Sequence, residues 1–164
     1  MRSRVLPPLL ALTATLAACA TAPSPVAPPA AGPAPIEGYD WIFHEDDGEA
    51  RLAYGVAESD DVRVALDCRR GSGRLALTAL AGPDAEPTIL IESGGETERF
   101  AAASEEDLLH DGLILSAMAA ADAPVFQRFR RTGWLALWQE GEREAYAPHP
   151  GSADRIERFF AFCG

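Results

Sequence analysis

Lysine is absent from this chain of 164 residues, so all 14 of its basic side chains are arginines. They face 25 acidic residues, and the formal net charge at neutral pH is −11. Such an acidic chain is repelled by nucleic acid phosphates and by anionic lipid head groups, so we expect no nucleic acid ligand. A cationic partner would be attracted. Solubility alone also accounts for an acidic surface.

The chain also lacks an apolar run of the roughly 20 residues that a membrane-spanning helix requires. Its apolar stretch at Val5–Leu16 is much shorter and is interrupted by Pro7 and Pro8, and no later stretch is longer. We therefore expect no transmembrane span.

The first 18 residues have the order of a signal peptide: basic, then apolar, then small. Arg2 and Arg4 precede the apolar stretch, and Leu16-Ala17-Ala18-Cys19 follows it. These four residues resemble the lipobox of bacterial lipoprotein precursors, and the resemblance covers only these positions. It implies cleavage in front of Cys19 and attachment of lipid to that cysteine. The alternative is a plain secretory signal in which Cys19 is incidental.

The resemblance also implies an anchor and a location. Several acyl chains on one residue bind firmly to a membrane, because each buried CH2 contributes about 0.8 kcal/mol. The inner-membrane retention signal of that family is an Asp after the cysteine, and Ala20 stands there instead. We therefore expect an outer-membrane protein that faces the periplasm. Removal of residues 1–18, with two arginines and no acid, moves the formal net charge from −11 to −13.

Residues 19–36 are expected to form the lipidated cysteine and a linker. Ala20–Ile36 contains six prolines and six alanines among 17 residues, which is too few large apolar groups for a core and too many prolines for a helix. In extended polyproline form, at about 3.1 Å per residue, it would hold a domain up to roughly 50 Å from the lipid.

Residues 37–164 are long enough for one domain of ordinary size. Short apolar runs between glycines and prolines predict strands, and the alternation from Val62 to Cys68 turns Cys68 inward. The strands are expected at 39–44, 52–56, 62–68, 74–80, 88–92, 97–101, 112–118, 134–139 and 142–146. Short turns between them predict antiparallel hairpins.

Two segments have a helical period. One begins after Pro124 and ends at Gly133, which would serve as its C-cap. The other begins near Ser152 and carries four apolar residues at i, i+3, i+4 and i+7, namely Ile156, Phe159, Phe160 and Cys163. The predicted fold class is mainly β (α+β): a small antiparallel β-sandwich or half-barrel, with one short internal helix and a C-terminal helix tied by a disulfide. In layout it resembles the uncharacterised small lipoproteins of proteobacterial envelopes.

If Cys19 carries lipid, Cys68 and Cys163 remain as an even pair, and pairing is the default in an exported protein. A bond between them would close a loop of about 95 residues, which the chain-entropy model values at up to about 4–5 kcal/mol. The alternative is two separate buried thiols. A redox-active role is disfavoured because neither cysteine lies in a Cys-x-x-Cys pair.

Motifs for metal or nucleophilic chemistry are incomplete. His44, His110 and His149 are too far apart for a local zinc site, and Gly48 replaces the second histidine of a metalloprotease helix. No serine lies in a Gly-x-Ser-x-Gly elbow. We expect no metal and no cofactor.

The acidic runs are expected to lie in loops. Residues 45–49 lack the alternating ligands of a calcium-binding loop and predict a hairpin turn instead. Residues 60–61 and 105–107 are expected to be solvated, and Ser104 with the acids after it could open a short helix.

A candidate binding surface contains Trp134 and Trp138, which share a strand face and either present two indoles to a sugar or peptide or cover the core. Arg128, Arg130 and Arg131 either hold an anion or pair with the acidic surface.

The leading hypothesis is a noncatalytic binding or structural domain of the cell envelope. In its sharper form, this domain captures a cationic protein. Membrane-bound lysozyme inhibitors act in this way, although their motifs are absent. The rival hypothesis is an envelope hydrolase acting on glycan or peptide. The sequence indicates no oligomeric state.

Overall fold

The computed structural model of the chain describes residues 32–108 and 111–164. Cys19 and the residues that resemble a signal peptide lie outside this part, as does His110. Ten strands and two helices follow one another in the described residues: β1 (Asp40–Asp46), β2 (Glu49–Gly55), β3 (Val62–Arg69), β4 (Arg74–Ala81), β5 (Thr88–Ser93), β6 (Glu96–Ala101), β7 (Ala103–Asp107), β8 (Gly112–Ala120), α1 (Pro124–Thr132), β9 (Leu135–Gln139), β10 (Glu142–Tyr146) and α2 (Ala153–Cys163).

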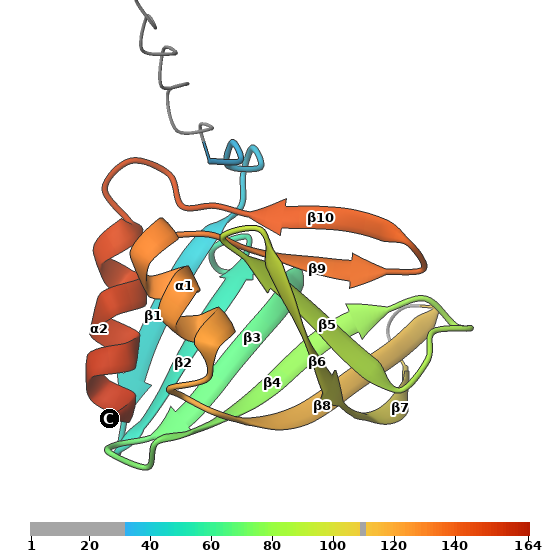
Figure 1. The fold of residues 1–164 in the computed structure, drawn as a ribbon, viewed down its shortest axis with the longest axis horizontal. Coiled ribbons are helices and arrows are strands. Elements are labelled where there is room, and N and C mark those ends of the chain that lie inside the picture. Colours follow the sequence, from blue (N-terminus) through green and yellow to red (C-terminus); the bar gives the residue numbers. More distant parts are fainter. Residues whose placement is uncertain (1–31, 109–110) are drawn as a thin grey trace, which may run out of the picture. The chain divides into compact units, whose positions relative to one another are not determined.

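The strands form two antiparallel sheets. Sheet A has the order β1-β2-β3-β4-β8-β7, and sheet B has the order β10-β9-β5-β6. Helix α2 packs on β1 and β2, α1 packs on β5, and the two helices contact each other (Figure 1). The predicted fold class is confirmed, in the form of two open sheets that face each other like a sandwich. None of the helices in the described ranges is long and apolar enough to cross a membrane.

Alternation along the strands decides which side chains enter the core. Val64, Leu66 and Cys68 of β3 are buried on the inner face of sheet A, as the sequence predicts. Ile89 and Ile91 of β5 enter the same core from sheet B. The predicted hairpins β3–β4, β5–β6 and β9–β10 are all present.

The internal helix ends where the sequence predicts. Gly133 has a φ of 77°, a left-handed conformation that costs glycine little, and its N–H donates to the Phe129 carbonyl at 2.8 Å. Phe126 and Phe129 turn into the core, and Phe129 contacts Trp41 with ring centroids 4.9 Å apart.

The disulfide between Cys68 and Cys163 is present, with a Cα–Cα distance of 5.8 Å. It joins β3 to the end of α2. The turn after β3 strengthens this junction, because the N–H groups of Gly71 and Gly73 donate to the carbonyls of Phe162 and Cys163 at 2.9 Å. Two of the last carbonyls of α2, which at a helix end have no N–H donor within the helix, therefore accept hydrogen bonds from this turn.

The prediction of a solvated loop or short helix at residues 105–107 is wrong. Residues Ala103–Asp107 form β7, which pairs antiparallel with β8 along the edge of sheet A. Four of its five residues are exposed, so the segment carries no apolar alternation that would predict a strand. Its charged side chains are typical of an edge strand, where they discourage pairing with another chain.

The end of the Pro/Ala-rich segment lies against the domain. Ile36 packs on the core, its N–H donates to the Tyr54 hydroxyl at 3.1 Å, and its carbonyl lies 3.3 Å from Nε2 of His149. The structured unit therefore includes residues that the sequence assigns to the linker.

Candidate functional site

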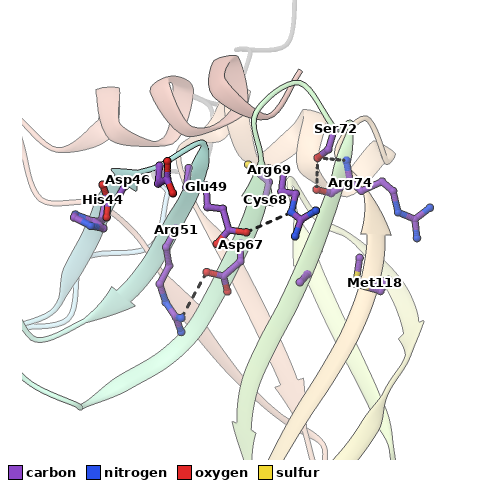
Figure 2. Close-up of a pocket in the computed structure, with 13 residues that line it drawn as sticks. His44, Asp46, Glu49, Arg51, Asp67, Cys68, Arg69, Ser72, Arg74 and Met118 are labelled. Carbon is purple, nitrogen blue, oxygen red and sulfur yellow. Dashed lines mark hydrogen bonds and ion pairs between the residues drawn. The ribbon is translucent and has the colours of Figure 1, made fainter.

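A groove of about 860 Å³ lies on the outer face of sheet A, near the turns that join β1 to β2 and β3 to β4 (Figure 2). One row of facing residues crosses its floor in register, one from each of β1, β2, β3, β4 and β8: His44, Arg51, Asp67, Ala76 and Met118. Met118 is 56% exposed, which is unusual for a large apolar side chain in this protein. The floor therefore combines charged groups with apolar surface.

Two ion pairs lie within the groove. Nη1 of Arg51 is 3.5 Å from Oδ1 of Asp67, and Nε of Arg69 is 3.3 Å from Oε1 of Glu49 (Figure 2). Both pairs join neighbouring strands, and the second is largely exposed. Exposed pairs of this kind contribute little to stability, at most about 1 kcal/mol, so they leave the groove charges available to a ligand.

The rim of the groove carries charges that these pairs do not neutralise. In residues 32–108 and 111–164, neither Asp46 nor Asp47 has a charged partner, and the guanidinium of Arg74 has none either. Asp46 ends β1 and Asp47 begins the turn, whereas Arg74 begins β4. The groove thus has a negative rim on the β1–β2 side and a positive rim on the β4 side.

Asp67 is the unusual acid of the groove floor. Burial raises its pKa, the Arg51 guanidinium opposes this by lowering it, and Glu49 raises it slightly. Because the pKa is raised on folding, ionised Asp67 is less favourable in the folded than in the unfolded chain at neutral pH. An acid held at such a cost in a cleft is a candidate ligand group.

The two predicted tryptophans lie on a second surface, at sheet B. Nε1 of Trp138 donates to Oε2 of Glu92 at 2.7 Å. Arg143 donates to both carboxylate oxygens of Glu92, at 2.8 and 2.9 Å, and its guanidinium lies 5.3 Å from the ring centroid of Trp134. The indoles are therefore engaged in a network within the protein, and only part of each is left for a ligand.

The pKa of Glu92 is lowered, first by the hydrogen bonds from Arg143, with burial opposing this and Trp138 adding to it. At pH values above the ordinary glutamate pKa of about 4.3, ionised Glu92 therefore stabilises the fold. This stabilisation is lost as the pH falls through the lower pKa that Glu92 has in the folded protein.

We expect Glu92→Gln to lower the free energy of unfolding by about 1–2 kcal/mol at pH 7, and the difference to vanish near pH 2. Urea unfolding at both pH values measures this. Glu96→Gln, which removes an exposed partner of Arg128, serves as the control and should cost less than about 1 kcal/mol.

The three arginines of the predicted surface do not gather into one anion site. Arg128 is only 13% exposed and pairs with Glu96 at 3.0 Å and Glu98 at 3.3 Å. Arg130 pairs with Glu157 at 2.5 Å. Arg131 donates to the carbonyl of Gln127, within its own helix. The alternative of pairing with the acidic surface therefore applies to Arg128 and Arg130.

A histidine, a carboxylate and a serine do meet at the start of α2. Oδ1 of Asp40 accepts the hydroxyl of Ser152 at 2.7 Å and the backbone N–H of His149 at 3.2 Å. The imidazole of His149 faces Ile36 instead, and Ser152 is only 3% exposed. These residues do not form a proton relay from serine through imidazole to carboxylate, and their hydrogen bonds join β1 to the start of α2.

Sequence reasoning misses the groove. Its residues come from five strands, and the acidic run at 45–49 is expected there only as a solvated turn. Groups of three or more residues able to hold a metal ion are absent from the described ranges.

Compared with known proteins, the chain matches no family model, no curated protein and no solved structure.

Proposed function

We propose that this protein is a lipid-anchored lipoprotein of the outer membrane, facing the periplasm, and that its domain binds a cationic protein in the groove of sheet A. The resemblance at Leu16–Cys19 supports the anchor, and a disulfide suits an exported domain. One observation carries the binding role: the lining of one groove contains Asp46 and Asp47, which have no charged partner among the described residues, and the partly buried Asp67.

A cationic side chain of the partner fits this arrangement. Entering from the β1–β2 side, such a side chain would meet Asp46 and Asp47 first, and a second one would reach Asp67, two strands further along the floor. A positive charge there offsets the cost of partly burying this carboxylate, so binding and ionisation of Asp67 favour each other. Met118 and Ala76 offer the apolar contact that a protein interface needs beside its charges.

A hydrolase acting on glycan or peptide is the second candidate. It would need an acid or nucleophile presented in a cleft, and the group of His149, Asp40 and Ser152 is occupied in joining β1 to α2. The groove offers Asp67 and Glu49 as a carboxylate pair, and each already faces an arginine. The noncatalytic role therefore has the stronger support.

The test is capture of proteins from an envelope extract by the immobilised protein, followed by their identification and measurement of affinity. We expect basic proteins to be enriched, and the double substitution Asp46→Asn with Asp47→Asn to weaken the affinity on the order of tenfold. Raising NaCl from roughly 50 to 500 mM should weaken it as well, because the screening length falls several-fold.

The matched control is Asp84→Asn with Glu86→Gln, which removes two exposed acids outside the groove. This variant has the same net charge as the first and should bind nearly as well as the unmodified protein. Equal losses in the two variants would mean that net charge alone attracts the partner. Capture that is indifferent to salt would rule out the electrostatic role altogether.

A further inference from the structure

The end of the Pro/Ala-rich segment lies on Trp134. A Cβ added to Gly32 would be 3.4 Å from Cδ1 and 3.5 Å from Nε1 of this indole, so the Gly32 backbone passes along the ring at close range. Arg143 lies over the same ring, 5.3 Å from its centroid. An indole beside a proline-containing extended segment is a common arrangement for polyproline recognition, because the segment is already extended and loses little entropy on binding.

The segment is fixed at its other end as well. Ile36 packs on the core, and both of its backbone polar groups have partners, in the Tyr54 hydroxyl and His149. Pro33 and Pro35 keep the residues in between extended. Residues 32–36, which we call the strap, are thus held at two points by different parts of the domain.

The strap and the negative rim of the groove lie at opposite ends of β1. The strap precedes the first residue of this strand, Asp40, and the rim begins at its last, Asp46. At about 3.3 Å per residue the strand separates them by roughly 20 Å. Figure 1 shows the segment before β1 and the turn after β1 at opposite ends of the domain.

We propose that the strap bound to Trp134 fixes the point at which the preceding chain leaves the domain, and that this biases the groove towards the side away from the membrane. The orientation rests on the proposed function, because it requires the lipid anchor at Cys19. The contact of the strap with Trp134 does not depend on that anchor. Cys19 and the strap are then separated by residues up to Ala31, and these 13 residues, counted from Cys19, would reach up to about 40 Å if they took an extended polyproline form. The acidic domain is also repelled by anionic lipids, so the groove stays open to a partner from the periplasm.

Amide hydrogen exchange of the full chain tests the strap. We expect the Ile36 N–H to be protected, and Trp134→Ala to speed its exchange by at least about tenfold, because the strap then loses one of its two attachments. Trp138→Ala, which removes an indole from the same face, should leave it unchanged. An unprotected Ile36 amide, or equal effects of the two substitutions, would overturn the strap.

A substitution in the strap provides a second measurement if Trp134→Ala fails to fold. The methyl group of Gly32→Ala would sit in ordinary van der Waals contact with the indole. We expect it to slow exchange at Ile36. No change or faster exchange would contradict the contact.

Energy transfer tests the orientation. The lipidated protein is placed in phosphatidylcholine vesicles that carry a trace of acceptor-labelled lipid, with a donor dye on Pro150→Cys, near His149, or on Asp47→Cys, at the groove. We expect stronger transfer from position 150. Equal or reversed transfer would refute the orientation.

The two proposals fail separately. The groove variant Asp46→Asn with Asp47→Asn should not alter exchange at Ile36. If the groove variant binds as tightly as the unmodified protein while the strap stays protected, that result counts against the binding role alone. An unprotected strap counts against this inference alone.

Discussion

Replacing Cys68 and Cys163 together by Ala should lower the free energy of unfolding by about 2–5 kcal/mol. The bond closes a long loop, with a sequence separation of 95 residues, and both cysteines are buried in the core. Part of this loss of stability comes from the higher conformational entropy of the unfolded chain without the bond. The rest comes from the weaker contact between β3 and α2. Urea unfolding monitored by circular dichroism measures the change, in a lipid-free chain in which Cys19→Ser prevents exchange of thiols.

Helix α2 should nevertheless remain docked in this variant. Its last carbonyls still accept the amides of Gly71 and Gly73, and Arg70 still lies 4.0 Å from the Phe162 ring centroid. Amide exchange near the end of α2 should therefore quicken without becoming that of an unfolded segment. Reduction of the disulfide in the Cys19→Ser chain is the matched control and should give a similar loss of stability. A double variant as stable as this chain would show that the bond contributes nothing to the fold.

Much of the fold can be predicted from the sequence because local patterns decide it. Alternation turns Cys68 inward, the i, i+3, i+4, i+7 spacing turns Cys163 inward, and the expectation of an exported protein then predicts that they pair. Gly133 ends α1 because its left-handed conformation needs a glycine. Each of these inferences uses residues that are close in the sequence or a single long-range rule.

The parts that the sequence does not reveal depend on long-range register. The β5–β9 pairing joins strands that are more than forty residues apart in the sequence, and no local sequence pattern predicts it. Edge strand β7 has no buried face to give it a period of two. The groove arises only when the facing rows of five strands align, so its acids look like those of any solvated turn. The strap is hidden for a similar reason, because a Pro/Ala-rich segment has the composition of a linker whether or not an indole holds it.

Asp40 is the polar group whose loss should cost the fold most. Its Oδ1 accepts the N–H of Trp41 at 2.9 Å in addition to the bonds from His149 and Ser152, and its Oδ2 lies 3.2 Å from Nη1 of Arg155. Asp40→Ala leaves the backbone N–H of His149 without this acceptor near the start of α2. We expect the free energy of unfolding to fall by about 2–4 kcal/mol, since several bonds to one charged group are lost together.

The control for this substitution lies at the other end of the same strand. Asp46→Ala removes the same side chain from an exposed position without a charged partner in the described part of the chain, so it should change stability by no more than about 0.5 kcal/mol. Urea unfolding of both variants compares them directly. Similar values for Asp40→Ala and Asp46→Ala would show that the cluster around Asp40 does not hold β1 to α2. In that event the close approach of His149, Asp40 and Ser152 would lack a structural explanation, and an assay for hydrolysis with Ser152→Ala would become the next measurement.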